Sequence, residues 1–312
     1  MTVRHPLLSP ETVRQIERAA SLHLGRRWVS QGFTDLNEQA SHPAGIHHGQ
    51  PFSVFAKLSV AADGRAQFAA ELSGLDLIRR RTPVATPTPV GTGLAEAEDG
   101  TLLLFEAVPE RPAPARTAAD YRAIGRTLAT LHQASDDRFG LAEFDGFFGP
   151  LAQDNKPVTS NRWADFYSER RVLPLLRTAV DSQNLPPDLT AAAENLVLRL
   201  DGLCGPEPRP ALLHGDAQQN NFLSTSYGAV VIDVCPYFGH PEIDLALVDI
   251  FGPAPADVLA GYREVLPVDP GFEFRRELWR VFAYLAVIAV DGRGPFGRQF
   301  IPRLADALGR YR

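Results

Sequence analysis

Hydrophobic and polar residues along this chain follow two different periods, separated by a proline-rich break at residues 109–114. Before the break, residues 52–58 alternate as in a strand, and residues 101–108 form a second, mostly apolar strand. Apolar residues recur at helical spacing in residues 9–24 and 65–80. The first part of the chain therefore predicts a small sheet with a pair of helices.

Three segments between these elements lack a clear helical period. Residues 28–40 and the Pro/Thr/Gly-rich residues 83–93 predict extended backbone. Residues 41–50 are rich in His, Gly and Pro and predict a loop. Histidines in this loop could bind a metal, although a solvated loop is the simpler interpretation: His42, His47 and His48.

The part of the chain after the break is dominated by helical spacing. No internal repeat or low-complexity segment stands out. Helices are expected at residues 118–133, 162–180, 187–203, 255–265, 272–290 and 299–311. A small sheet followed by a larger helical region predicts two lobes.

A loop at residues 214–221 carries the most specific chemical pattern. It places Asp216 five residues before Asn221, and the apolar strand that follows ends at Asp233. Such an aspartate can accept a proton from a substrate hydroxyl, while the asparagine and the second aspartate can hold Mg²⁺ against nucleotide phosphates. The alternative is a polar loop in which Asp216 and Asn221 make only local turn hydrogen bonds.

The context of this loop favours phosphoryl transfer. Residues 211–213 predict a short buried strand that leads into the loop, and residues 229–232 predict a second strand that ends at Asp233. Residues 224–228 supply a polar turn between them, as a hairpin requires. A catalytic loop of this kind within the helical region is typical of a kinase-like layout.

We therefore predict an α+β, two-lobed, protein-kinase-like fold. Residues 1–108 are expected to form a small antiparallel-sheet lobe that binds nucleotide. Residues 109–312 are expected to form a larger, mainly helical lobe with the catalytic loop and the acceptor site.

Lysine usage adds a candidate phosphate ligand. Of the 31 basic residues, the only lysines are Lys57 and Lys156. A lysine retained in so arginine-rich a chain can indicate a need for a compact charge on a flexible stem. Lys57 lies in the strand at 52–58, and Glu71 in the following helix could pair with it. The alternatives are an exposed strand lysine and a surface glutamate.

Composition limits the class of protein. The hydrophobic share of 45% and charged share of 22% are those of a globular protein, and a net charge of −6 argues against general nucleic-acid binding. No apolar run reaches membrane-spanning length, and the first ten residues lack the apolar core of a signal peptide. Because Cys204 and Cys235 are the only cysteines, we expect no disulfide framework and a cytoplasmic location.

Three further segments have specific patterns. Residues 236–246 and 251–252 give PYFGHPEIDLA and FG, residues 125–132 give GRTLATLH, and residues 153–171 contain QDN, WADFY and ERR. They resemble the "YYGHREADLA…FGG", "lG..LA.LH" and "PQ.N…W..F…eRL" segments of the fructosamine kinase family. This family lies in the aminoglycoside-phosphotransferase and choline-kinase branch of the protein-kinase-like fold. The resemblance covers most of the chain.

The resemblance implies roles for individual residues. Asp216 matches the catalytic base, and Asn221 and Asp233 match the Mg²⁺ ligands. Lys57 and Glu71 match the lysine that contacts the ATP phosphates and its helix partner. The remaining matches are the backbone of Glu106 and Val108, expected to bind adenine, and Asp244, expected to brace the catalytic loop.

The chain departs from the family inside the loop itself. The family usually has HGDLWxGN, whereas residues 217–220 here are Ala-Gln-Gln-Asn, which places Gln218 near the expected acceptor. Residues 31–50, at the expected phosphate-covering loop, lack a clear G-x-G. Cys235 replaces a small residue, and we expect it to be a buried packing residue rather than a redox-sensitive thiol.

The resemblance implies an ATP- and Mg²⁺-dependent kinase that phosphorylates a sugar hydroxyl of a fructosamine or ketosamine, including glycated amino acids or proteins. Asp165 and Glu169 could attract the amine of such a substrate. A kinase for an aminoglycoside, another antibiotic or an amino-alcohol is the nearest alternative, and a nucleotide-binding pseudokinase is a more distant one. We expect no nucleic-acid or membrane partner, and a monomer or weak dimer.

Overall fold

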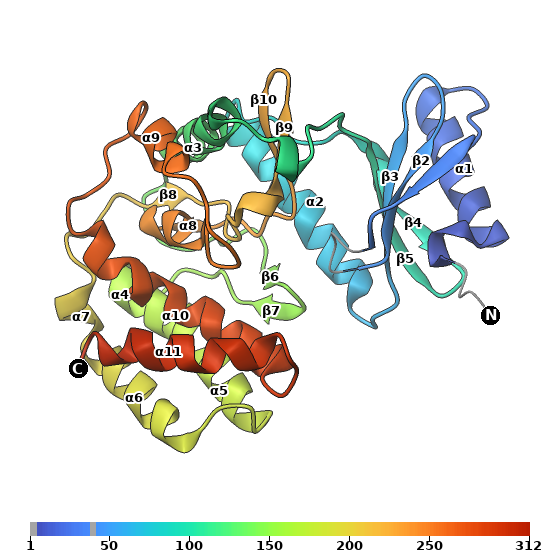
Figure 1. Ribbon diagram of the computed structural model, residues 1–312. Helices are drawn as coiled ribbons and strands as arrows, with labels where there is room; N and C mark the ends of the chain where they lie inside the picture. The colour runs from blue at the N-terminus through green and yellow to red at the C-terminus, as the bar shows by residue number, and fades with distance from the viewer. Residues whose placement is uncertain (1–4, 38–41) are drawn as a thin grey trace.

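The chain folds into two lobes, one built on a sheet and the other mainly helical (Figure 1). The computed structural model describes residues 5–37 and 42–312. Within these ranges, no helix is both long enough and apolar enough to cross a membrane. The antiparallel sheet and the helical lobe that the sequence predicts are both present.

The sheet lobe contains five antiparallel strands in the order β1-β2-β3-β5-β4. The strands are β1 (Gly32–Asp35), β2 (Ala44–His48), β3 (Val54–Ser59), β4 (Pro89–Ala97) and β5 (Gly100–Glu106). Helix α1 (Pro10–Leu24) follows a single 3₁₀ turn (Pro6–Leu8) and packs on β4. Its start is fixed by Ser9, whose Oγ accepts the Thr12 amide, and its end by Gly25 at a φ of 71°.

Helix α2 (Gly64–Arg81) lies between the sheet and the helical lobe (Figure 1). A core cluster with α1 and one face of the sheet includes Ile16 and Leu104. Phe68 and Leu75 of α2 belong to a larger cluster, which fills the helical lobe and also takes in Leu103 and Phe105 of β5. A Cβ added at Gly74 would lie 2.6 Å from Cδ of Pro236. Glycine thus allows α2 to pack closely on the segment that follows Asp233.

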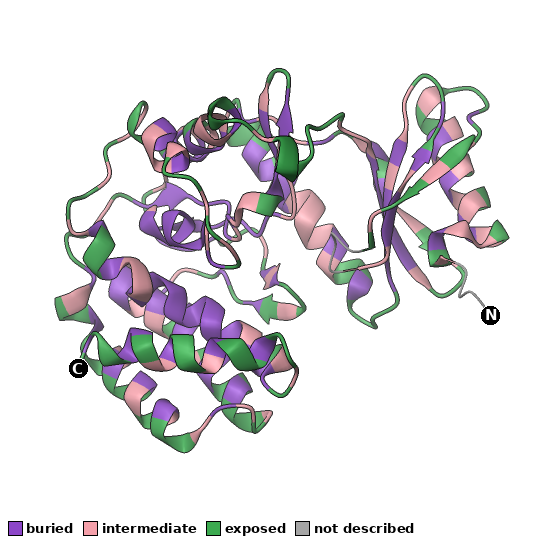
Figure 2. Cartoon of the chain, viewed as in Figure 1, coloured by how far each residue is buried: buried purple, intermediate pink, exposed green. Residues whose placement is uncertain are grey.

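Helix α10 is long and lies at the centre of the helical lobe. Buried residues are concentrated in α10 and α8 (Figure 2). Its longer helices are α3 (Ala118–Gln133), α5 (Leu173–Asp181), α6 (Pro187–Leu198), α9 (Asp257–Arg263), α10 (Phe272–Asp291) and α11 (Phe300–Gly309). The shorter ones are α4 (Trp163–Phe166), α7 (Leu200–Leu203) and α8 (Glu242–Leu247), with single 3₁₀ turns at Ala113–Ala115, Gln219–Asn221 and Gly297–Gln299. Its strands form three pairs: β6 (Gly146–Phe148) with β7 (Leu151–Gln153), β8 (Ala211–Leu212) with β11 (Phe238–Gly239), and β9 (Phe222–Thr225) with β10 (Gly228–Val231).

Two sequence predictions about strands were wrong. The loop predicted at residues 41–50 contains β2, because residues 44–48 are paired between β1 and β3. The hairpin that leads to Asp233 consists of β9 and β10, whereas residues 211–212 pair with β11 instead. In both cases, pairing with distant segments decides the structure and local composition does not reveal it.

The helix predicted over residues 162–180 is helical throughout but changes its hydrogen-bond pattern at Tyr167–Val172, which form a π-helical turn. The turn contains the fully buried Arg171, whose guanidinium lies 3.9 Å from the ring centroid of Tyr237. The predicted division between residues 1–108 and 109–312 stays a prediction.

Candidate active site

Three charged side chains from distant parts of the sequence meet where the two lobes face each other. Lys57 on β3 donates from Nζ to Oδ1 of Asp233 at 2.6 Å, and the same Nζ lies 3.6 Å from Oε2 of Glu71 on α2. Burial opposes the charge of Lys57, but the Asp233 and Glu71 carboxylates outweigh burial and raise its pKa. The structure thus brings together the lysine, its helix partner and the aspartate that the sequence singled out.

The loop at residues 214–221 is held in place by Asp244 of α8. Asp244 is fully buried, and its carboxylate accepts the backbone N–H of His214 at 2.6 Å and of Gly215 at 3.0 Å. Gly215 has a φ of 86°, and a Cβ there would lie 2.1 Å from the Cys235 carbonyl oxygen. The expected bracing role of Asp244 is confirmed by these contacts, and the sharp turn at this position requires glycine.

The brace extends to α3 through His132. Its Nε2 lies 3.0 Å from Oδ2 of Asp244, and its Nδ1 lies 2.9 Å from the hydroxyl of Tyr262. Gly125, on the same helix, lets α9 approach, because a Cβ there would lie 1.9 Å from the Val258 carbonyl oxygen. This explains why glycine and histidine occur at the two ends of residues 125–132.

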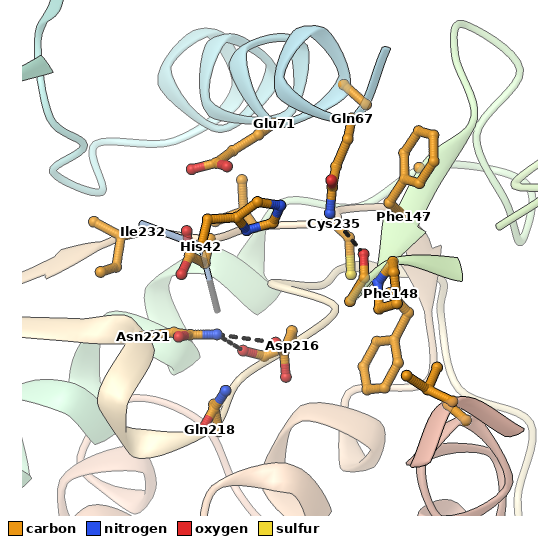
Figure 3. Close-up of a pocket in the computed structure, with 18 of the residues that line it drawn as sticks. His42, Gln67, Glu71, Phe147, Phe148, Asp216, Gln218, Asn221, Ile232 and Cys235 are labelled. Carbon is orange, nitrogen blue, oxygen red and sulfur yellow. Dashed lines mark hydrogen bonds between the residues drawn. The ribbon is translucent and has the colours of Figure 1, made fainter. Parts of the chain in front are cut away.

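Asp216 and Asn221 lie together in the loop (Figure 3). The Asn221 side-chain nitrogen donates to the backbone oxygen of Asp216 at 2.8 Å and to its Oδ2 at 3.1 Å. Because the nitrogen is used in these bonds, the side-chain oxygen of Asn221 is the atom available to an oxygen-seeking cation. Burial, and next the charge of Asp233, raise the pKa of Asp216 to about 7.

Asp233 follows strand β10 and has a φ of 52°, an uncommon conformation for a residue with a side chain. Such conformations cluster at functional sites, where surrounding contacts maintain them. Burial tends to raise the pKa of Asp233, but the Lys57 ammonium outweighs that effect and lowers it. Asp233 is thus held as a carboxylate beside Asn221 and Lys57.

Two cavities meet at these residues. One has a volume of about 510 Å³ and the other about 420 Å³. Both are lined by Lys57, Glu71, Asn220, Ile232 and Asp233. A group placed at this junction can therefore be reached from either cavity.

The larger cavity extends from the junction toward the segment that connects the lobes. Apolar side chains from both lobes line it, with Ile46 and Phe55 from the sheet and Leu223 from β9. Glu106 and Val108 also line it, and their expected contact with adenine stays a prediction. A mainly apolar cavity of this kind suits a flat heteroaromatic ring.

The smaller cavity lies on the other side, between α2, β6 and α10. Asp216 and Gln218 line it, together with Phe147 and Phe148 (Figure 3). Asp165 and Glu169 do not line either cavity, because they lie on α4 and the π-helical turn. Their predicted contact with an acceptor is therefore not supported.

The sequence missed the position of His42 and Gln67 at this cavity. His42 packs on the Phe68 ring with centroids 5.5 Å apart and faces the cavity, while Gln67 donates to the Gly149 carbonyl oxygen at 2.8 Å (Figure 3). His47, predicted in a solvated loop, is fully buried beside Phe33. None of these three positions has a local signal in the sequence, because each depends on contacts with segments that are distant along the chain.

The described residues contain no group of three or more His, Cys, Asp or Glu side chains suited to a metal ion. Mg²⁺ does not need such a group, because one or two carboxylates and substrate phosphates usually complete its coordination. Asn221 and Asp233 carry side-chain oxygen atoms of the kind that Mg²⁺ prefers, and their role as its ligands stays a prediction. Cys235 is a free, buried thiol whose pKa is raised by burial, in agreement with a packing role.

Comparison with known proteins identifies the family. The family model described as fructosamine kinase matches residues 12–307. The chain belongs to the fructosamine kinase family. It is therefore a phosphotransferase with an alcohol group as acceptor.

Individual relatives agree with this assignment. A Klebsiella aerogenes protein named "probable ketoamine kinase" is 31% identical over 219 residues, which cover 70% of this chain and 73% of the relative. A Thermobifida fusca crystal structure described as a "putative fructosamine-3-kinase" has a TM-score of 0.77 at 31% identity, and the match covers 95% of this chain and 97% of that chain. A structure of an aminoglycoside phosphotransferase with ADP and hygromycin B, at 17% identity and a TM-score of 0.61 over 95% of this chain and 98% of its own, shares the fold. The predicted two-lobed, protein-kinase-like fold is thus confirmed.

Proposed function

We propose that this member of the fructosamine kinase family transfers the γ-phosphoryl group of ATP to a sugar hydroxyl of a ketoamine. The observation that carries the proposal is the junction of the two cavities, where Lys57, Asp233 and Asn221 lie beside Asp216. Phosphoryl transfer needs a nucleotide on one side of such a centre and an acceptor hydroxyl on the other.

In this proposal, the larger cavity holds the nucleotide. Its apolar slot receives adenine, and the backbone of Glu106 and Val108 provides polar groups for the ring edge. Lys57 contacts the phosphates, and Glu71 keeps the lysine stem directed toward them. Asn221 and Asp233 would hold Mg²⁺, which would neutralise the charge that spreads over the transferred group.

The smaller cavity holds the acceptor. Asp216 orients the substrate hydroxyl and accepts its proton as the hydroxyl oxygen bonds to the γ-phosphorus. The Asn221 amide keeps the Asp216 carboxylate in place. Asp244 fixes the backbone of the loop through two buried hydrogen bonds. The position of Asp216 relative to the junction is therefore set by the protein and not by contacts with water.

An acceptor panel tests this proposal. ADP release is measured with Mg²⁺-ATP and fructosyl-lysine, an aminoglycoside, choline or no acceptor, and the products are identified by mass spectrometry and NMR. We expect phosphorylation of the ketoamine at a sugar hydroxyl, and loss of turnover when Mg²⁺ is chelated. If only the aminoglycoside or only choline is turned over, that compound is the acceptor and the ketoamine proposal is wrong. Nucleotide binding without any turnover would favour a pseudokinase.

A further inference from the structure

The acceptor cavity has an aromatic rim that the transfer of a phosphoryl group to a sugar does not require. Phe251, Val290 and Phe296 line this cavity, yet their side chains stay 38%, 51% and 52% exposed. The rings of Phe251 and Phe296 lie 5.9 Å apart, and both contact Phe300 of α11. A cluster of exposed apolar side chains beside a catalytic carboxylate marks a surface that a ligand covers.

Another part of the cavity lining is also aromatic. Phe147 and Phe148 of β6 face the cavity, and Phe148 is anchored by Phe282 of α10 at a ring distance of 5.2 Å (Figure 3). The cavity is therefore lined by aromatic groups from two separate segments, together with Asp216. A sugar can pack its C–H face on one aromatic ring, which leaves the remaining apolar lining for another part of the substrate.

The charges of the cavity restrict the ligand further. Among the described residues that line it, Lys57 is the only lysine or arginine, and its ammonium is paired with Asp233 and Glu71. Two other carboxylates line it, Asp216 at the base and Asp291 at the end of α10, where Oδ2 also accepts the Gly297 amide at 2.7 Å. The cavity thus attracts a protonated amine and offers no cation to a free carboxylate.

We propose that the cavity selects ketoamines whose amine carries an uncharged apolar or aromatic substituent, and disfavours those made from amino acids with a nearby free carboxylate. The proposal rests on the ketoamine function proposed above and adds the class of substituent. The sugar lies at Asp216, and the substituent is covered by Phe251 and Phe296, which act as specificity-determining residues.

Three synthetic ketoamines with the same sugar test the proposal. They are fructose derivatives of benzylamine, ethanolamine and glycine, and steady-state kcat and KM are measured for each. We expect kcat/KM of the benzylamine compound to exceed that of the ethanolamine compound by about tenfold, mainly through KM, because a buried phenyl ring stabilises both ground and transition states. The glycine compound should be the poorest of the three.

Two variants assign the effect to the rim. Phe251→Ala and Phe296→Ala should each raise KM for the benzylamine compound severalfold more than they raise KM for the ethanolamine compound. Phe274→Ala is the matched control, because Phe274 is 59% exposed and packs on Tyr311, outside the cavity. This substitution should leave kcat and KM unchanged for both substrates.

The outcomes separate this inference from the function on which it rests. Equal kcat/KM for the three ketoamines overturns the inference alone, as does a preference that survives both rim substitutions or that falls equally in Phe274→Ala. Absence of turnover with every ketoamine, together with turnover of another acceptor, overturns the proposed function and the inference with it.

Discussion

Replacement of Asp244 by Asn tests how far the catalytic loop depends on one buried carboxylate. The amide is almost isosteric, but one of its two positions is a donor and cannot accept a backbone N–H. One of the hydrogen bonds from His214 and Gly215, 2.6 Å and 3.0 Å long, is therefore lost. A hydrogen bond to a charged acceptor contributes about 1.5–3 kcal/mol.

We expect Asp244→Asn to lower the free energy of unfolding by about 2–3 kcal/mol. For a chain of this size this corresponds to a fall of roughly 3–5 °C in Tm. The loop also loses its fixed position, and a displacement of one ångström at a reacting centre can reduce turnover by about a hundredfold. Urea unfolding followed by fluorescence gives the first value, and ADP release under saturating substrates gives kcat.

Glu242→Gln is the matched control for this experiment. Glu242 lies on the same helix and is equally buried, but its carboxylate binds Arg275 and Trp279 instead of the loop. Breaking this buried ion pair should cost about 3–5 kcal/mol of stability. Well below its Tm, however, kcat should stay close to wild type. The reasoning is refuted if Asp244→Asn retains wild-type stability and kcat, or if both variants lose kcat equally.

Three further predictions concern the catalytic base Asp216, the buried His240, and the contact that Gly125 of α3 makes with α9. Asp216→Asn should reduce kcat at least a hundredfold while the Kd of ATP, measured by calorimetry, changes little; near-normal turnover would exclude Asp216 as the base. Burial, and then the charge of Arg275, lower the pKa of His240 from 6.5 to about 3, so its stabilising effect is complete above pH 6.5 and is lost as pH falls toward 3. Between pH 7 and 5 the wild type should therefore lose about 2 kcal/mol of unfolding free energy more than His240→Asn, and parallel pH profiles in urea unfolding would contradict this. Gly125→Ala should lower Tm by several degrees without changing the KM of either substrate, because the new Cβ meets the Val258 carbonyl oxygen; an unchanged Tm would show that α3 and α9 separate freely.

The chemistry of the site could be predicted from the sequence for two reasons. Some of its key residues occur close together along the chain, and one of them belongs to a residue type that is rare in this chain. Asp216 and Asn221 share one loop, and Lys57 is one of two lysines in the chain. The loop itself fixes the geometry of the first pair, through the bond from Asn221 to Asp216. Elements with a strong helical period, such as residues 118–133, were also predicted with accurate ends, because Thr117 and Asp120 form a capping box.

The acceptor side could not be predicted in the same way. Its lining comes from α2, β6, the catalytic loop and α10, and no local pattern indicates that these segments converge. Asp165 and Glu169 were chosen for their charge alone, and neither lines the cavity. His42 lies in a loop, as predicted, but nothing in the composition of that loop indicates that it lines the cavity. The cytoplasmic location and the oligomeric state stay predictions.

Helix α2 packs closely on both lobes. A Cβ at Gly74 would lie 2.6 Å from Cδ of Pro236 in the helical lobe, and a Cβ at Gly93 of β4 would lie 2.6 Å from Cδ2 of Leu72 on α2. Any opening or closing of the lobes would therefore have to change one of these two contacts. Lys57 belongs to the sheet, whereas Asp233 belongs to the helical lobe. The distance from the lysine ammonium to the Asp233 carboxylate, 2.6 Å here, is consequently a direct gauge of closure.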